Sequence, residues 1–270
     1  MTDLSTLFPV NTNICYLNHA AVAPWSQSTA DCVVQFAREN AELGATEYPK
    51  WLGVEADLRN NLKRLLNARS TSEIALVKNT SEGLSFIASG LDWQAGDEVV
   101  ITNQEFPSNY IVWESLIPEG VTVTAVNISN PETATDALCH AISERIKLVS
   151  VSSVQYASGL RLDLKRIGDR CVATDTLFCV DAIQSLGVLP MDCQETSADF
   201  IVADGHKWLL GPEGLGVFYI KKETIPRLTV SEYGWHMVKQ RGNYDIHEWE
   251  IADDAKRFEW AAPICFAPMP

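Results

Sequence analysis

Short, mostly apolar runs recur along the chain and alternate with longer segments whose apolar residues repeat roughly every three to four positions. A short apolar run is typical of a buried strand, whereas the longer repeat is typical of a helix with one buried face. The predicted strands are Ile74–Val77, Glu98–Thr102, Val121–Val126, Lys147–Ser152, Thr176–Val180, Phe200–Ala203 and Leu215–Ile220. The predicted helices are Ser26–Leu43, Pro49–Asn67, Ser81–Leu91, Pro107–Ile117 and Glu132–Arg145.

This alternation indicates an α/β fold with a mainly parallel sheet that is covered by helices on both faces. Four residues with possible ligand contacts lie at or just beyond predicted strand ends. Open α/β sheets bind ligands at the carboxyl ends of their strands, so we expect these residues to share one site. They are Thr80, Phe106, Asp181 and Lys207.

Lys207 follows the strand Phe200–Ala203 almost at once and precedes a glycine-rich turn. Glycines let the backbone turn tightly and approach a ligand closely. A positioned, partly desolvated lysine amine can form a Schiff base with an aldehyde. This pattern favours pyridoxal 5'-phosphate (PLP) as the cofactor. A surface lysine that merely follows a strand is the alternative left open by this segment alone.

PLP chemistry needs a carboxylate that keeps the pyridine nitrogen protonated, so that the ring can accept electrons. Asp181 ends a short apolar run, where a buried carboxylate is costly unless it has a partner. A pyridinium N–H would be such a partner, although Asp181 could instead cap the following turn. Gln184, three residues further on, could reach the phenolic oxygen of the cofactor.

A phosphate cradle is expected where a strand gives way to the helix that begins near Thr80 and Ser81. Helix N-termini favour anions, and both hydroxyls could donate to a phosphate. An ordinary helix cap is the alternative interpretation. Phe106 lies in a strand-to-helix loop before a proline, where its ring could stack on the pyridine or belong to the core.

Taken together, these segments resemble the class V aminotransferase family of PLP enzymes, which includes cysteine desulfurases, selenocysteine lyases and kynureninases. The resemblance covers about residues 16–259, and the order and spacing of its motifs are much more specific than any one of them. The motifs are Tyr16–Pro24, Asn79–Gly83, Glu105–Asn109, Val180–Gln184 and Gly205–Trp208.

The resemblance implies a role for each candidate residue. Lys207 would be the Schiff-base and catalytic lysine, Asp181 the pyridine-nitrogen partner and Gln184 the phenolic-oxygen partner. Phe106 would stack on the ring. The phosphate would be bound by Thr80, Ser81 and His206. Desulfurases commonly have a histidine in place of Phe106 and a serine in place of Asp204. An aspartate there would repel the phosphate unless it points elsewhere, so no role is carried over to Asp204.

The family also implies a homodimer and a small C-terminal domain that this chain lacks. We expect an N-terminal segment 1–15, a PLP-binding large domain 16–259 and an atypical tail 260–270, which follows the motif ending at Glu259. The tail contains three prolines and no charge, and Cys265 does not match the family's catalytic cysteine loop. A shortened or frame-shifted chain is the interpretation that this pattern favours.

Composition is consistent with an intracellular enzyme. The net charge of −14 argues against nucleic-acid and anionic-membrane partners, which require basic patches. The seven cysteines show no C-x-x-C spacing and the five histidines no i,i+4 pair, so we expect no disulfide framework and no metal. Without an apolar stretch of membrane-spanning length or a charged apolar leader, a cytoplasmic location is expected.

The predicted function is therefore a PLP-dependent transferase or lyase acting on an amino acid through Lys207. A cysteine desulfurase or selenocysteine lyase is one alternative. A catalytically silent, shortened PLP-binding fragment is the other. Lys207 indicates the cofactor, whereas the reaction depends on residues outside the motifs.

Overall fold

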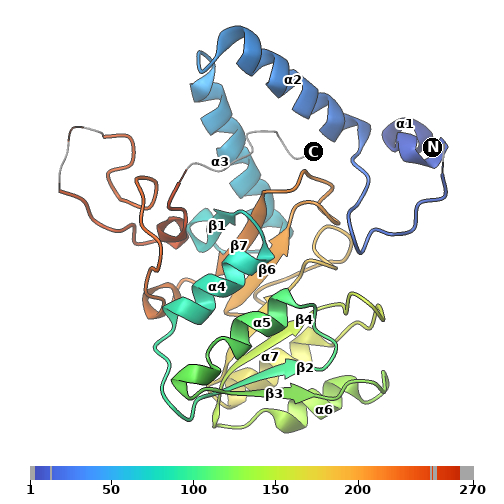
Figure 1. Ribbon diagram of the computed structural model, residues 1–270, viewed down its shortest axis with the longest axis vertical. Coiled ribbons are helices and arrows are strands. Elements are labelled where there is room, and N and C mark those ends of the chain that lie inside the picture. The colour runs from blue at the N-terminus through green and yellow to red at the C-terminus, as the bar shows by residue number, and fades with distance from the viewer. Residues whose placement is uncertain (1–3, 13, 244, 246–247, 262–270) are drawn as a thin grey trace.

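A single mixed sheet forms the centre of the computed structural model, which describes residues 4–12, 14–243, 245 and 248–261 (Figure 1). The order of its seven strands is β1-β7-β6-β5-β4-β2-β3. The strands are β1 (Ile74–Val77), β2 (Glu98–Thr102), β3 (Thr122–Val126), β4 (Ile146–Ser152), β5 (Leu177–Asp181), β6 (Phe200–Asp204) and β7 (Gly216–Ile220).

Strand direction brings the ends of three separate strands to one edge of the sheet. β2 through β6 pair in parallel, and β7 runs antiparallel to both β6 and β1. Because two reversals cancel, β1 points the same way as β6. The carboxyl ends of β1, β5 and β6 therefore lie at the same edge. Asp204 and Val77 both pair with Gly216, the first residue of β7.

Helices cover both faces of the sheet, as the alternating pattern predicts. Buried residues of α4 and α5 pack on one face, together with Phe258. Buried residues of α6, α7 and the end of α3 pack on the other. The helices are α1 (Leu4–Leu7), α2 (Gln27–Leu43), α3 (Tyr48–Leu65), α4 (Thr80–Gly90), α5 (Ser108–Glu114), α6 (Ala134–Ala141) and α7 (Leu164–Ala173).

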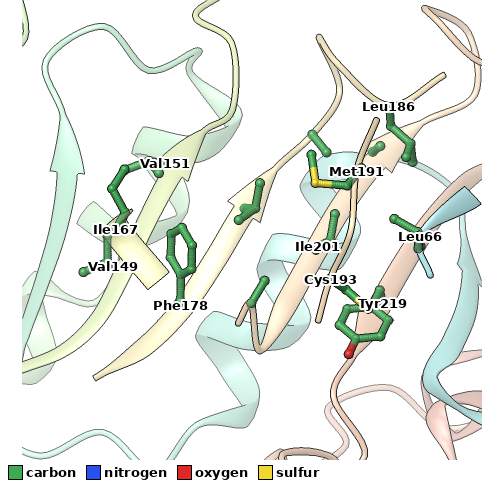
Figure 2. Packing of buried hydrophobic residues seen from close by; sticks show 14 of the residues in the cluster. Leu66, Val149, Val151, Ile167, Phe178, Leu186, Met191, Cys193, Ile201 and Tyr219 are labelled. Carbon is green, nitrogen blue, oxygen red and sulfur yellow. The ribbon is translucent and has the colours of Figure 1, made fainter. Parts of the chain in front are cut away.

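The second face contains the larger apolar cluster. Figure 2 shows part of it, with Phe178 of β5, Ile201 of β6 and Tyr219 of β7 on that face of the sheet. All three side chains are almost fully buried. Burial of such aromatic and branched side chains contributes roughly 1.5–3 kcal/mol each. The polar residues at the strand ends therefore project from a rigid base.

Short 3-10 helices and a helical arm complete the fold. α2 and the first part of α3 stand away from the sheet (Figure 1), whereas Leu62 and Leu66 at the end of α3 join the core. The 3-10 helices are η1 (Pro9–Thr12), η2 (Thr71–Glu73), η3 (Ile117–Glu119), η4 (Ile225–Arg227) and η5 (Ala255–Phe258). No helix among the described residues is long and apolar enough to cross a membrane.

The expected α/β class and all seven strands are confirmed, with ends that differ by at most a residue. Helices differ more. The predicted helix Pro107–Ile117 is shorter, Ser108–Glu114, and Glu132–Arg145 reduces to Ala134–Ala141. α7 was not predicted from the sequence; it carries Gly168 in its middle. A Cβ there would lie 1.8 Å from the Thr196 carbonyl oxygen, so this glycine permits close packing despite its poor helix propensity.

Candidate cofactor site

The carboxyl ends of β1, β5 and β6 bring together residues that are far apart in the sequence. Thr80 begins α4 directly after β1, Asp181 ends β5 and Asp204 ends β6. Lys207 follows β6 by three residues. All four residues are buried. The structure thus places Thr80, Asp181 and Lys207, three of the residues expected to share a site, at one edge of the sheet together with Asp204; this region is the candidate site.

Lys207 lies in the loop between β6 and β7, which backbone hydrogen bonds hold in place. The Gly205 N–H donates to the Leu215 carbonyl oxygen and the Gly211 N–H to the Gly205 carbonyl oxygen, both at 2.8 Å. The Lys207 side chain is only 6% exposed. Burial lowers its pKa, while the negative charges of Asp181 and Asp204 oppose that shift. A larger share of neutral, nucleophilic amine follows.

Asp181 is a buried carboxylate with little compensation. Its side chain is 2% exposed and accepts one hydrogen bond, from the Ile183 N–H at 3.0 Å. Burial raises its pKa to about 7, and the neighbouring Glu105 and Asp204 carboxylates add to this shift. A cationic N–H donor placed here would favour the ionised form. Asp181 therefore has the properties expected of a pyridine-nitrogen partner.

The start of α4 has the properties of an anion site. Asn79 caps the helix by accepting from the Glu82 N–H at 2.9 Å, and the N–H groups of the first turn point outward. The buried Thr80 hydroxyl makes no hydrogen bond to the described residues. Ser81 is exposed, and its hydroxyl shares a 2.9 Å hydrogen bond with Ser108.

Asp204 lies against this helix start, a position that the sequence analysis left without a role. Its Oδ1 accepts from the Thr80 N–H at 2.5 Å, and its Oδ2 lies 3.6 Å from His206 Nδ1. Two of the three residues expected to bind phosphate, Thr80 and His206, therefore contact Asp204. Only the strand register reveals this arrangement, because β1 and β6 are separated by more than a hundred residues.

Phe106 presents a ring to the same region. It is 41% exposed, and Lys207 Nζ lies 5.5 Å from its ring centroid. Tyr156 contacts it edge to face at 5.1 Å between centroids. An exposed aromatic face beside the amine can stack on a planar ligand. Phe106 therefore lies beside Lys207 and outside the apolar core, and its stacking role stays a prediction.

Glu105 fixes the loop that carries Phe106, a role that was not predicted from the sequence. Its carboxylate accepts hydrogen bonds from Thr102 Oγ1 at 2.7 Å, Asn109 Nδ2 at 2.9 Å and Ser152 Oγ at 2.5 Å. Gln155 Nε2 donates to it at 3.1 Å. The loop between β2 and α5 is therefore fixed to β4. The motif Glu105–Asn109 was the available signal, but Ser152 and Gln155 come from the end of β4 and the segment that follows it.

Gln184 binds the N-terminal segment and Trp208. Its Nε2 donates to the Ala20 carbonyl oxygen at 2.9 Å, and its Oε1 accepts from Trp208 Nε1 at 3.3 Å. His19 stacks on Trp208 with centroids 5.1 Å apart, and the Ala23 N–H donates to the His206 carbonyl oxygen at 3.0 Å. The segment around residues 19–23 therefore packs beside the site. The phenolic-oxygen role of Gln184 stays a prediction.

These groups fit PLP in three respects. The pKa of the Lys207 amine is lowered, and the buried Asp181 carboxylate accepts a single hydrogen bond from the described residues. Phe106 presents an exposed aromatic ring. The start of α4 adds a buried hydroxyl without a partner, at Thr80. Asp204 alone conflicts, because it puts negative charge where a phosphate would bind. No group of three metal-ligating side chains occurs within the described ranges, and Cys265 and His247 lie outside them.

Comparisons with known proteins give one consistent result. The family model Aminotransferase class-V matches residues 15–268. A probable cysteine desulfurase of Methanothermobacter thermautotrophicus is 33% identical over 226 residues, which are 80% of this chain and 55% of that protein. A probable cysteine desulfurase of Ureaplasma parvum is 30% identical over 97% of this chain and 67% of its own. This chain thus spans about half to two thirds of the length of these relatives.

Solved structures are similar in fold. A glycine-bound variant of the enzyme C-DES, described with its PLP cofactor, superposes with a TM-score of 0.88 at 23% identity. That match covers all of this chain and 71% of the other. The apo cysteine desulfurase of Thermococcus onnurineus has a TM-score of 0.83 at 22% identity, over 99% of this chain and 68% of that one.

Proposed function

Because this chain belongs to the class V aminotransferase family, we propose that it is a PLP-dependent enzyme that acts on an amino acid. Lys207 would carry the cofactor. The observation that supports this most strongly is the buried Lys207 amine, whose pKa is lowered although Asp181 and Asp204 are near. Holding a lysine in that state is costly for a purely structural role.

Each residue of the site has a distinct task in this proposal. Lys207 would hold the cofactor through its neutral amine, and the same amine would accept and return a proton at the substrate Cα. Asp181 would keep the pyridine nitrogen protonated. Phe106 would pack against the ring and exclude water from it. When bound, PLP supplies an electron sink for the negative charge that develops at the substrate carbon.

The cofactor assignment is tested by trapping. Purified protein is mixed with PLP, reduced with borohydride and digested, and the modified lysine is identified by mass spectrometry. We expect the adduct on Lys207 and its loss in Lys207→Ala. Lys221→Ala is the matched control, because Lys221 follows β7 at the opposite edge of the sheet and pairs with Asp199 at 3.8 Å. An adduct at another lysine in the wild type contradicts the site.

A cysteine desulfurase or related C–S lyase is the second candidate reaction. The observation that favours it is the name "cysteine desulfurase" carried by relatives at 30–33% identity. Sulfide release from cysteine is compared with amino transfer to a keto acid, using the same PLP-loaded protein. Sulfide without amino transfer supports the second candidate. An adduct at Lys207 with neither activity supports the catalytically silent fragment.

Two expectations from the sequence remain part of the proposal. We propose a homodimer, which analytical ultracentrifugation of the purified chain tests directly. We also propose a cytoplasmic location, which fractionation of the source cells tests. Neither is needed for the cofactor assignment.

A further inference from the structure

A carboxylate lies at the anion-binding end of α4. Asp204 Oδ1 accepts from the Thr80 N–H at 2.5 Å. α4 spans eleven residues, and its N-terminus carries the positive end of the helix dipole. Anions bind at such ends through the free N–H groups of the first turn. Asp204 is thus an internal anion at the place where a phosphate is expected.

The site has unused binding capacity besides this contact. The Thr80 hydroxyl is buried and has no hydrogen-bond partner among the described residues. It belongs to the same residue whose N–H binds Asp204. A buried hydroxyl without a partner is costly, and a phosphate oxygen would satisfy it. The helix start therefore has a donor for a ligand in addition to the one that Asp204 occupies.

Close packing fixes the carboxylate in this position. A Cβ at Gly216 of β7 would lie 3.1 Å from Asp204 Oδ1 and 2.8 Å from the Ala203 carbonyl oxygen. A Cβ at Gly83 of α4 would lie 2.8 Å from Val202 Cγ1 of β6. α4 therefore packs closely on β6, and β7 packs closely against Asp204. A ligand that enters must bind beside this carboxylate.

The charged groups near Asp204 only partly compensate it. His206 Nδ1 lies 3.6 Å from Oδ2, and Lys207 and Asp181 are titratable neighbours. α4 carries Glu82 in its first turn, and that carboxylate pairs with Lys78 at 3.0 Å. Burial raises the pKa of Asp204, while His206, Thr80 and Lys207 oppose that shift.

We propose that Asp204 makes phosphate binding proton-linked, so that the phosphate of PLP enters this site together with one proton from solvent. This inference rests on the proposed PLP function. A phosphate monoester is mostly dianionic above about pH 6. Two anions that share one site cannot both stay fully ionised, because each raises the pKa of the other. The proton would be held between the carboxyl and phosphate oxygens.

The linkage makes affinity depend on pH in a defined direction. Proton uptake on binding lowers PLP affinity as pH rises, by about tenfold per pH unit at full linkage. Asp204→Asn removes the charge and keeps the shape, so its affinity should vary less with pH. At pH 8 the variant should bind PLP more than about tenfold tighter than the wild type. Asp204→Ser is a second variant that removes the charge with a smaller side chain.

Calorimetric titration with PLP between pH 7 and 8 tests the proposal. Measurements in two buffers of different ionisation enthalpy give the number of protons taken up. We expect about one more proton for the wild type than for either variant. Pyridoxal, which lacks the phosphate, is the control ligand and should show no such difference. Circular dichroism identifies any variant that has not folded, and the comparison then uses the other variant.

Inorganic phosphate separates this inference from the proposed function. Tighter phosphate binding by the Asp204 variants, with no PLP adduct at Lys207, supports the anion site and contradicts the PLP enzyme. An adduct at Lys207 with equal proton uptake in wild type and variants overturns the inference and leaves the PLP enzyme intact. Equal effects of the variants on PLP and pyridoxal also overturn it, because the phosphate is then not involved.

Discussion

Two clusters of buried charged residues lie near β1, and they differ in how many partners each charged group has. On one side, the Arg59 side chain of α3 is 4% exposed and forms a two-pronged pair with Glu259, at 2.6 and 2.7 Å. Glu55 and the Ile74 carbonyl oxygen accept further hydrogen bonds from Arg59, and the Leu76 N–H donates to Glu259. Nearly every charged atom in this cluster has a partner from the chain itself.

In the candidate cofactor site, by contrast, the charged groups have few partners among the described residues. Lys207 forms no ion pair within 4.0 Å among the described residues, and Asp181 accepts only one hydrogen bond. The pKa of Lys207 is lowered and that of Asp181 is raised. Both shifts move the residues toward their neutral forms. In the Arg59 cluster, by contrast, Glu259 and Glu55 outweigh burial and raise the pKa of Arg59.

The number of partners decides whether a buried charged residue serves the fold or the chemistry. A buried charge with a full set of partners is locked in its ionised form and stabilises one packing. A buried charge without them stays able to change its protonation state when a ligand arrives. The following variants test that contrast.

Lys207→Ala has the largest expected effect. If it lowered stability instead of activity, the contrast between the two clusters would be wrong. We expect turnover by PLP-loaded protein to fall by about 10²–10⁴-fold, because the proton-transfer group is gone. Stability without cofactor should not fall, since the amine is buried without an ion partner. Activity assays and urea unfolding measure the two effects. A large loss of stability would instead assign Lys207 to the scaffold.

Glu259→Ala is the opposite case. It leaves Arg59 buried with one fewer partner, so we expect the free energy of unfolding to drop by about 3–5 kcal/mol. Urea unfolding measures this drop. The exposed pair Lys165–Asp169 provides the control, because Asp169→Ala should change stability little. PLP labelling of Lys207 in the folded fraction of Glu259→Ala should persist. Its loss would show that the cofactor site depends on the Arg59 cluster.

Asp181→Asn tests the site through pH. The pKa of Asp181 is raised from 3.8 to about 7 in the folded protein, so the fold binds a proton that the unfolded chain releases. Wild-type stability should therefore fall as pH rises from about 4 to about 7, by up to the order of 4 kcal/mol relative to Asp181→Asn. Urea unfolding across this range measures the difference. The pH dependence should shrink when PLP is bound, and a dependence unchanged by PLP would count against Asp181 as its partner.

Phe106→Ala has the smallest expected effect and tests whether this exposed ring contributes to PLP binding. Loss of ring stacking should weaken PLP binding by about 0.5–1.5 kcal/mol, which is up to about tenfold in affinity. Fluorescence titration with PLP measures it. Tyr156→Phe keeps the edge-to-face contact and should bind PLP like the wild type. Equal affinity in Phe106→Ala and wild type would remove Phe106 from the site.

Most strands were predictable because they are short, largely apolar runs that are buried on both faces. The edge strand β3 is partly exposed, and its β-branched Thr and Val residues are typical of strands. Helix ends were less predictable: α6 stops at Ala141, although polar residues continue to Arg145. α7 escaped prediction because Gly168 weakens its local helix signal, while its packing against Thr196 comes from a distant segment. Local propensity is overridden wherever tertiary contacts contribute more free energy.

The strand–helix alternation, the family motifs and the position of Lys207, Asp181 and Phe106 after particular strands can be read from the amino-acid sequence. These features follow from local order along the chain. The hydrogen bonds from the Thr80 N–H to Asp204, from Ser152 and Gln155 to Glu105, and from Gln184 to Ala20 are seen only in the folded structure. Such contacts depend on strand order and register, which join residues that no local pattern connects.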